Sequence, residues 1–140
     1  MKVSTKGRYA IRALTHLSGA YSNDGAKPVS IREICKREKI SARYLENIFV
    51  KLRKSGIVKS LKGERGGFFL AKSPGEITIY DILYSVETGV APSKCAVDIK
   101  ACARAGKCGI RKIWVNLDKK VVEYLSQTSL EEAARLHLNG

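Results

Sequence analysis

Apolar side chains recur every three or four positions in the first part of the chain, which is the period of helices with one buried face. In residues 3–20 these positions are Tyr9, Ala10, Ala13, Leu14 and Leu17. A turn-rich loop over residues 22–28 follows, and Ser30 then stands three positions before Glu33. In this capping-box spacing each side chain accepts a hydrogen bond from the backbone N–H of the other residue. The pattern predicts one helix over residues 3–20 and a shorter one after Ser30.

The next helix is predicted after a break near Lys39 and Ile40. Ser41 is placed to accept a hydrogen bond from its first turn, and Gly56 suits the left-handed conformation that commonly ends a helix. Its apolar positions again follow helical spacing: Leu45, Ile48, Phe49 and Leu52. Two helices joined by such a tight turn form a helix-turn-helix.

The hydrophobic period changes after Gly56, from helical spacing to the short apolar runs that are typical of strands. Residues 57–61 and 68–71 are the predicted strands, and the segment between them, residues 62–67, is rich in glycine and charge. The pattern therefore predicts a β-hairpin. Because this hairpin directly follows a helix-turn-helix, it occupies the position of a wing.

Three further helices are predicted in the second half of the chain. Thr78 and Asp81 have capping-box spacing, for a helix that we expect to end near Gly89. Residues 93–109 lack apolar periodicity and are predicted to form a loop. From Ile110 onward a helix of about 25 Å is predicted, with apolar positions at Ile113, Trp114, Leu117, Val121, Val122, Tyr124 and Leu125. A final short helix is predicted to begin near Thr128, with Glu131 as its capping partner.

Positive charge is concentrated in the first half of the predicted fold. The chain of 140 residues has a net charge of +13, and residues 1–65 hold 16 basic against 5 acidic side chains, a net charge of +11. Such an asymmetry favours a polyanionic partner, either nucleic acid or an anionic membrane surface. The alternative is a basic but inert solvated surface.

Neither a membrane-inserted segment nor a catalytic centre is predicted. The first residues lack the apolar region of a secretory signal, and no apolar run approaches the roughly 20 residues needed to span a bilayer. We therefore expect a soluble, cytoplasmic protein. Neither His16 nor His137 lies in a recognisable catalytic arrangement, so we expect no enzymatic activity and no small-molecule substrate.

The helix after Ser41 is the candidate for insertion into a DNA major groove, where its first turns would contact bases and phosphates. The candidate side chains lie on or beside the face opposite the apolar positions: Arg43, Tyr44, Glu46 and Asn47. Arg43 suits guanine or phosphate, Asn47 suits adenine and Tyr44 suits phosphate. Glu46 is unfavourable beside DNA unless it meets a cytosine amino group, which makes it a candidate discriminator between sites. Alternatively, it is an exposed residue that pairs with Arg43 or Lys54.

The tip of the predicted wing carries Lys62 and Arg65 among three glycines. A slender basic tip is suited to approach the phosphate backbone or a narrow minor groove. The alternative is a solvated turn whose glycines only reverse the chain direction. Lys6, Arg8 and Arg12 on the first helix are predicted to add to the attraction for phosphates.

Three of the four cysteines, Cys95, Cys102 and Cys108, lie in the predicted loop over residues 93–109, which contains no histidine. In a reducing compartment such thiols favour metal binding, redox chemistry or burial over disulfides. Zinc would need a remote fourth ligand, whereas three cysteines and one weaker ligand are compatible with a labile iron–sulfur cluster. Redox-active thiols and an inert surface loop are the alternatives. Cys35 is expected to be a small buried thiol.

The sequence resembles the IscR-type winged-helix transcription regulators, a group whose relatives include NsrR and CymR. The matching segments are STKGRYAIRAL (residues 4–14), SARYLENIFVKLRKSGIVKS (41–60), KGERGGFFLAK (62–72) and the spaced cysteines. We therefore expect a mainly α-helical fold with a small β-hairpin wing. A winged helix-turn-helix DNA-binding domain would cover residues 1–76, a connecting helix and cysteine-rich cluster-binding loop 77–109, and a dimerisation helix with a C-terminal helix 110–140.

The resemblance implies a homodimer in which the long helices cross and each winged helix binds one half of a pseudo-palindromic promoter site in double-stranded DNA. It also implies a [2Fe–2S] cluster on Cys95, Cys102 and Cys108, and control of iron–sulfur assembly genes. Glu46 matches a residue that discriminates between classes of site, and Lys62 matches a wing residue that approaches the minor groove. Metal-free, thiol- or partner-responsive control of cysteine metabolism and nitric-oxide-sensing repression are the alternatives within the group, and an iron–sulfur carrier is the alternative outside it.

The fourth cluster ligand does not follow from the resemblance. The histidine that IscR supplies three residues after the last cysteine is Arg111 here, and the acidic N-terminal residue of NsrR-like proteins is Arg8. Asp81, Glu87, Asp98 or a residue of a second subunit are the candidates.

Overall fold

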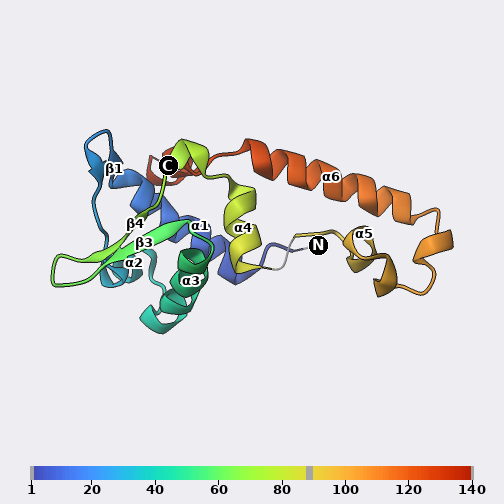
Figure 1. The fold of residues 1–140 in the computed structure, drawn as a ribbon, viewed down its shortest axis with the longest axis horizontal. Coiled ribbons are helices and arrows are strands. Elements are labelled where there is room, and N and C mark those ends of the chain that lie inside the picture. Colours follow the sequence, from blue (N-terminus) through green and yellow to red (C-terminus); the bar gives the residue numbers. More distant parts are fainter. Residues whose placement is uncertain (1, 88–89, 140) are drawn as a thin grey trace.

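A compact helical body carries a long arm in the computed structural model, which describes residues 2–87 and 90–139 (Figure 1). The body begins with three helices, α1 (Thr5–Gly19), α2 (Ile31–Glu38) and α3 (Ala42–Lys54). The wing follows as an antiparallel pair, β3 (Val58–Leu61) and β4 (Gly67–Leu70). The mainly α-helical winged helix-turn-helix fold that the sequence predicts is therefore confirmed.

Serine caps start the helices of the body where the sequence predicts them. The Ser30 hydroxyl accepts a hydrogen bond from the Glu33 N–H of α2, and the Ser41 hydroxyl accepts one from the Tyr44 N–H of α3. Between the two helices Lys39 takes a left-handed conformation with φ of 55°. Because a left-handed residue reverses the chain direction sharply, α3 can begin almost immediately after α2.

Burial of the apolar face of α3 organises the body. Its four predicted core residues are fully buried: Leu45, Ile48, Phe49 and Leu52. They join a core that includes Leu14 and Leu17 of α1, also almost fully buried. Burying each such side chain contributes roughly 1.5–3 kcal/mol. The opposite face of α3 is consequently fixed toward solvent.

The wing is attached to the body by both backbone and side-chain contacts. Val29, just before α2, pairs with Phe68 of β4 through two backbone hydrogen bonds of 2.8 and 2.9 Å. The Phe68 ring packs against Phe49 of α3, with ring centroids 4.6 Å apart. The position of the wing is therefore coupled to that of α3.

Some details of the fold differ from the sequence prediction, among them helix α5 (Lys94–Val97) within the predicted loop over residues 93–109. The loop at 22–28 contains a short hairpin of β1 (Tyr21–Ser22) and β2 (Gly25–Ala26). Helix α4 (Ile79–Val86) has the predicted Thr78–Asp81 capping box but ends at Val86, and the predicted end at Gly89 lies outside the described residues.

The cap of the last helix is one residue later than predicted, at Ser129 with Glu132. The physical reason is that Thr128 is already used. Its hydroxyl donates to the Tyr124 carbonyl at the end of the preceding helix.

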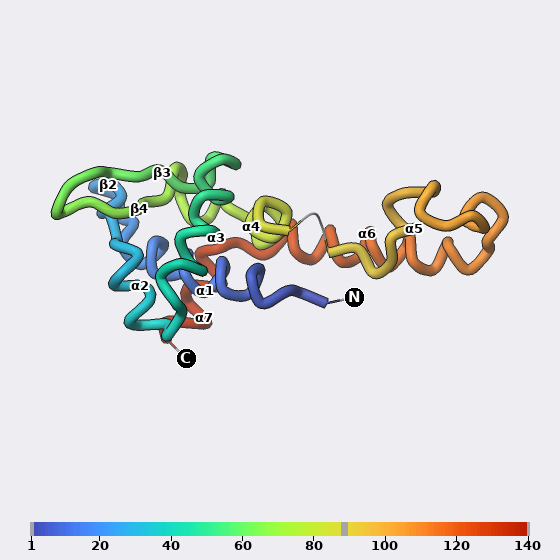
Figure 2. Tube along the Cα trace, turned by 90° about the horizontal axis from the view of Figure 1, so that it is seen from below, coloured from blue at the N-terminus to red at the C-terminus, as the bar shows by residue number. Residues whose placement is uncertain are grey.

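The arm is formed by the long helix and the cysteine loop. Helix α6 (Arg111–Gln127) extends from the body, and α5 (Lys94–Val97) lies beside it, as both views show (Figures 1 and 2). Two 3-10 turns complete the loop, η2 (Ile99–Ala101) and η3 (Ala105–Lys107), while another, η1 (Pro74–Glu76), precedes α4. No helix among residues 2–87 and 90–139 is long and apolar enough to cross a membrane.

The C-terminal helix returns to the body after the arm. Helix α7 (Leu130–Leu138) packs against α1, and its first residue, Leu130, is fully buried. Two backbone hydrogen bonds join its start to the segment before α4, from Leu130 to Ile77 (2.8 Å) and from Ile79 to Thr128 (2.9 Å). The C-terminal end of α6 thus leads to a segment that the rest of the body holds in place.

Gly67, the first residue of β4, is expected to be intolerant of a side chain. Its φ is +151°, and a Cβ there would lie 2.4 Å from the Val29 carbonyl oxygen. Gly67→Ala should therefore lower the free energy of unfolding by about 1–3 kcal/mol, measured by urea denaturation.

Gly106→Ala is the matched control, because nothing lies within 4 Å of a Cβ at that position. It should leave the urea midpoint nearly unchanged. Equal midpoints for the two variants would contradict the tight fit between the wing and the segment before α2.

Candidate nucleic-acid interface and cysteine loop

The solvent face of α3 presents the side chains that the sequence assigns to DNA. Arg43, Glu46 and Asn47 are exposed and Tyr44 is half-buried, whereas the opposite face lies in the core. No ion pair holds Glu46 among the residues that the structure describes, so the predicted pairing with Arg43 or Lys54 is not formed. The Glu46 carboxylate is therefore free to meet a partner.

Tyr44 is held by the first helix. Its ring contacts the edge of Tyr9 with centroids 5.6 Å apart. This contact restricts the orientation of Tyr44 and links the first turns of α3 to α1. A tyrosine held in this way is suited to a fixed contact with a phosphate.

A pair of lysines lies beside Tyr44. A side-chain hydrogen bond between Lys6 of α1 and Lys51 of α3, together with their like charges, lowers the pKa of the Lys51 side chain. Both lysines line a shallow groove together with Tyr44 and Glu87. Two ammonium groups at one position can bind one phosphate, which relieves their repulsion.

Lys51 was not singled out by sequence analysis. Its only signal was a positive charge in the last turn of α3. Lys51 becomes recognisable as a candidate phosphate contact only because the tertiary fold places Lys6 beside it.

The basic residues of α1 do not all remain free for phosphate. The Arg12 Nε donates to Glu38 at 2.9 Å, and the Arg8 guanidinium donates to the Thr5 hydroxyl at 3.2 Å. Arg12 thus contacts Glu38 through one nitrogen while 45% of its side chain is exposed, and its attraction for phosphates stays a prediction. Lys6 is the α1 cation that the fold brings to the exposed side of α3.

The wing presents its two predicted cations to solvent. Lys62 and Arg65 are exposed at the tip, where Gly66 N–H donates to the Gly63 carbonyl at 3.0 Å. The tip lies at the end of the molecule opposite the arm (Figure 2). The wing and the cysteine loop are therefore separated by the whole body.

All three cysteines of the loop are free thiols. Cys95 is half-buried in α5, and Cys102 and Cys108 are exposed. Within the described part of the chain, the three thiols do not converge on one point as the ligands of a single metal ion would. Three thiols are a donor set that a zinc ion or an iron–sulfur cluster can use once a fourth ligand is added.

The candidate fourth ligands differ in the hydrogen bonds that their carboxylates already accept. Glu87 accepts hydrogen bonds from the backbone N–H (3.0 Å) and the hydroxyl of Ser4, and Asp81 accepts from Thr78 in its capping box (3.1 Å). Asp98 lies within the loop and accepts from the Lys100 N–H at 2.9 Å. Asp98 is thus the acidic candidate that shares the loop with the three thiols.

Arg111 has a definite structural role where the histidine of IscR was expected. Its Nε donates to the Cys95 carbonyl at 2.7 Å, so it joins the first turn of α6 to α5. Ser93 lies next to the same cysteine, with its hydroxyl 3.2 Å from the Cys95 Sγ. Arg111 therefore positions the backbone of the loop.

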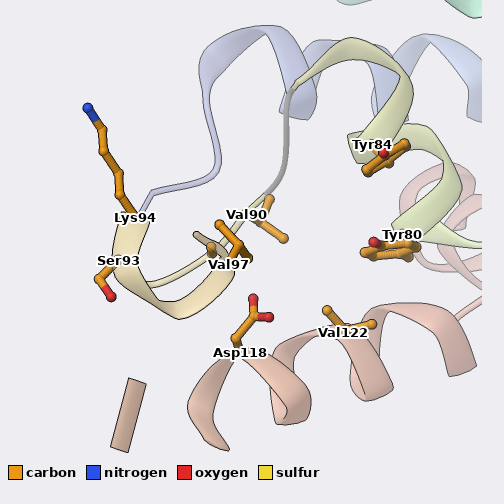
Figure 3. A pocket seen from close by; sticks show the side chains of 9 residues that line it. Tyr80, Tyr84, Val90, Ser93, Lys94, Val97, Asp118 and Val122 are labelled. Carbon is orange, nitrogen blue, oxygen red and sulfur yellow. The ribbon is translucent and has the colours of Figure 1, made fainter. Parts of the chain in front are cut away.

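A cleft of about 440 Å³ separates the cysteine loop from α4. Figure 3 shows Tyr80 and Tyr84 on one side, Val97 on another and the Asp118 carboxylate pointing inward from α6. The two tyrosine rings stack with centroids 5.8 Å apart. Sequence analysis missed Asp118, because an isolated acid in an amphipathic helix carries no signal of a cavity.

The two histidines, far apart in sequence, meet at one carboxylate. His16 Nε2 of α1 lies 2.6 Å from the Glu38 Oε1, and His137 Nε2 of α7 lies 2.7 Å from the same oxygen. Burial acts to raise the pKa of the Glu38 carboxyl, but the hydrogen bonds from both histidines and the charge of Arg12 outweigh it and lower that pKa. No sequence signal indicated this cluster.

Cys35 packs against the core but is only half-buried. Burial raises the pKa of its thiol, and the negative charge of Glu46 acts in the same direction. A thiol with a raised pKa is a poor nucleophile and metal ligand. Cys35 is therefore less buried than the sequence analysis expected, although it packs against the core.

Comparison with known proteins relates the chain to a family of regulators. Residues 3–135 match the Rrf2 family model, described as "Iron-dependent Transcriptional regulator". The chain is 34% identical to the HTH-type transcriptional regulator IscR of Photorhabdus laumondii over 132 residues, which covers 94% of this chain and 78% of that protein.

Solved structures agree with this relationship. The chain is similar to CymR, the global cysteine regulator of B. subtilis, with a TM-score of 0.78 and 32% identity over 97% of this chain and 98% of that one. It is also similar to T. potens IscR, with a TM-score of 0.71 and 30% identity over 94% and 85% of the two chains. These relatives are transcriptional regulators. The chain therefore belongs to the Rrf2 family of transcriptional regulators and resembles its IscR members.

Proposed function

We propose that the protein is a homodimeric, cytoplasmic DNA-binding regulator that senses iron–sulfur status through a labile [2Fe–2S] cluster and controls iron–sulfur assembly genes. One observation carries this proposal. Three free thiols, Cys95, Cys102 and Cys108, occupy a loop on the arm whose long helix leads back to a basic winged helix. Helix α6 thus connects the proposed sensing loop with the part of the chain proposed to bind DNA.

DNA binding is supported by shape and charge together. The solvent face of α3 and the wing tip carry the predicted contact residues, and Lys6 and Lys51 add a cationic groove beside Tyr44. A helix of this kind fits the major groove of B-DNA, and a slender wing fits a neighbouring groove or the phosphate backbone. Phosphate contacts would set the register of the protein on DNA, and Arg43, Glu46 and Asn47 would select the bases.

A second copy of the chain is the proposed partner of α6. None of the residues of this helix is buried, although it carries an apolar stripe. The exposed fractions are 58% for Ile113, 38% for Trp114 and 68% for Tyr124. An apolar stripe on a helix that projects from the body matches the same stripe on a second copy, which gives a two-fold interface. Two winged helices related in this way would read a pseudo-palindromic site.

The cysteine loop has the composition that a thiolate-ligated cluster needs. Cys95, Cys102 and Cys108 would hold the cluster, with Asp98 as a candidate fourth ligand from the same loop. When bound, the cluster supplies a centre that iron supply and oxidants can change. Residues of the loop offset the negative charge of the ligands: Lys94, Lys100, Arg104, Lys107 and Arg111.

Helix α6 provides the route from the loop to DNA. Arg111 ties its first turn to the Cys95 carbonyl, and Val121 and Leu125 near its other end pack against the body core. Ordering of the loop around a cluster would therefore change how α6 is held. A shift of α6 in the dimer would alter the separation of the two winged helices and hence the preferred promoter class.

The likeness to CymR supports a second candidate function, in which the thiols respond to oxidants or to a protein partner without a cluster. The exposed Cys102 and Cys108 are accessible to such chemistry. A nitric-oxide-sensing repressor is a third candidate within the same fold. The presence of iron and acid-labile sulfide in the purified protein separates the metal-free candidate from the two that use a cluster.

The first prediction about function concerns iron and sulfide binding by the cysteine loop. Anaerobic reconstitution should give about two iron and two sulfide per subunit, with visible absorption, because three thiolates and one weaker ligand complete the ligand set. Cys102→Ser should abolish this uptake, and it should also remove any difference in promoter preference between cluster-loaded and cluster-free protein.

Cys35→Ser is the control, because this thiol lies in the body and should not affect iron binding. A colourless protein that still binds promoter DNA, and whose binding responds to oxidants through Cys102, would replace the cluster proposal with the metal-free one.

The second prediction concerns the wing. Arg65→Ala should weaken binding to all promoter sites and reduce the slope of log K against log salt by about one, because one phosphate contact is lost. Fluorescence anisotropy at several salt concentrations measures both effects. Lys120→Ala removes the same charge from α6, where Lys120 pairs with Glu123, and should leave the slope unchanged.

The third prediction concerns Glu46. Glu46→Ala should change the ratio of affinities for two promoter classes by about tenfold or more, since a good base contact discriminates by about 1–3 kcal/mol. Glu64→Ala, at the exposed wing tip, removes the same charge and should strengthen binding to all sites alike. A uniform effect of Glu46→Ala on both classes would remove its discriminating role.

A further inference from the structure

Three helices from distant parts of the sequence meet at the Glu38 carboxylate. His16 comes from α1, Glu38 ends α2 and His137 comes from α7, the last helix of the chain. The two imidazole Nε2 atoms and the carboxylate oxygen all lie within 4.8 Å of one another. The site is well enclosed at two of the three side chains, with 8% of His16, 6% of Glu38 and 35% of His137 exposed.

The donor atoms have the chemistry of a transition-metal site. Two imidazole nitrogens and one carboxylate oxygen form a ligand set that zinc uses with water as the fourth ligand. The two rings are nearly perpendicular, at 83°, so their Nε2 atoms approach Glu38 from different directions. Two donors that approach one oxygen in this way leave a shared position that a cation can occupy with small side-chain rotations.

Arg12 fixes the carboxylate in the orientation that the site requires. Its Nε binds Oε2 of Glu38 at 2.9 Å, while both histidines face Oε1. One carboxylate oxygen is thus held by Arg12 and the other faces the two imidazoles. A partner that holds the outer atom of a ligating side chain is a regular feature of protein metal sites.

A shallow groove beside His16 gives solvent access to the cluster. It runs between α1 and α7 and is lined by His16, Glu33 and Leu138. His137, the most exposed of the three ligands, lies on the solvent side. Of the three proposed ligands, His137 is therefore the most open to an incoming ion and to water, and His16 borders the groove.

We propose that His16, Glu38 and His137 bind one zinc ion, with water as the fourth ligand, and that this ion fastens α7 to α1 and α2. The site is separate from the cysteine loop, which lies on the arm (Figure 1). It therefore does not depend on the iron–sulfur proposal. The alternative is a purely hydrogen-bonded cluster in which both histidines only donate to Glu38.

The proposed ion would influence DNA binding through the helices that it joins. Helix α7 follows the arm helix α6, and α2 directly precedes α3. An ion shared by α1, α2 and α7 would hold the end of the arm against the helix-turn-helix. Zinc occupancy would thus stabilise the arrangement in which the two winged helices of a dimer are presented to DNA.

The test uses the full chain with Cys95→Ser, Cys102→Ser and Cys108→Ser, so that the loop cannot bind zinc. After treatment with a chelator, titration with zinc chloride should show one ion per subunit by calorimetry. X-ray absorption should show only nitrogen and oxygen ligands. At free zinc 100-fold above Kd, the equilibrium constant for unfolding should fall about 100-fold, measured as a higher denaturation midpoint.

His137→Gln separates the two interpretations. A glutamine amide can still donate to Glu38 but is a poor zinc ligand, so zinc binding should fall at least tenfold while the stability of the metal-free protein changes little. Glu33→Gln, beside the groove, removes a carboxylate outside the ligand set and should leave binding unchanged. Absence of zinc binding in the protein without the three loop thiols, or equal binding by His137→Gln, would overturn the proposal.

Discussion

Burial of the apolar face of α3 is the interaction on which the rest of the structure depends. Leu45, Ile48, Phe49 and Leu52 leave water together, and this fixes the rotation of α3 about its own axis. Because the apolar face is buried, Arg43, Glu46 and Asn47 on the other side of α3 are exposed to solvent. The same burial brings Phe49 against Phe68, so that the wing is positioned by the core that positions α3.

The molecule consists of a well-packed body and an arm that has little core of its own. Ala105 is the buried residue of the loop between α5 and α6, and α6 has none in the single chain. The low burial has a physical consequence. Few apolar contacts inside the arm leave it stabilised less by its own packing than the body is.

Much of the fold could be predicted because its signals are local. A serine or threonine before most of the helices, a left-handed residue after α2 and α3, and an apolar position every three or four residues act within one turn of helix. The cap of the last helix was predicted wrongly because two neighbouring residues can serve as the cap. Thr128 and Ser129 are both good caps, and the choice between them depended on whether the Thr128 hydroxyl would bind Tyr124 instead.

The residue pattern is enough to predict the longer helices and the wing, because each depends on residues close together in the chain. The positive charge of the DNA-facing half and the three thiols of the loop are also visible in the sequence. Only the tertiary structure decided which distant side chains meet. It joined Lys6 to Lys51, paired Arg12 with Glu38 and brought His16 and His137 to the same carboxylate. The physical reason is that these contacts follow from the packing of whole helices, in which the buried faces set the geometry and the polar residues at their margins are brought together as a result.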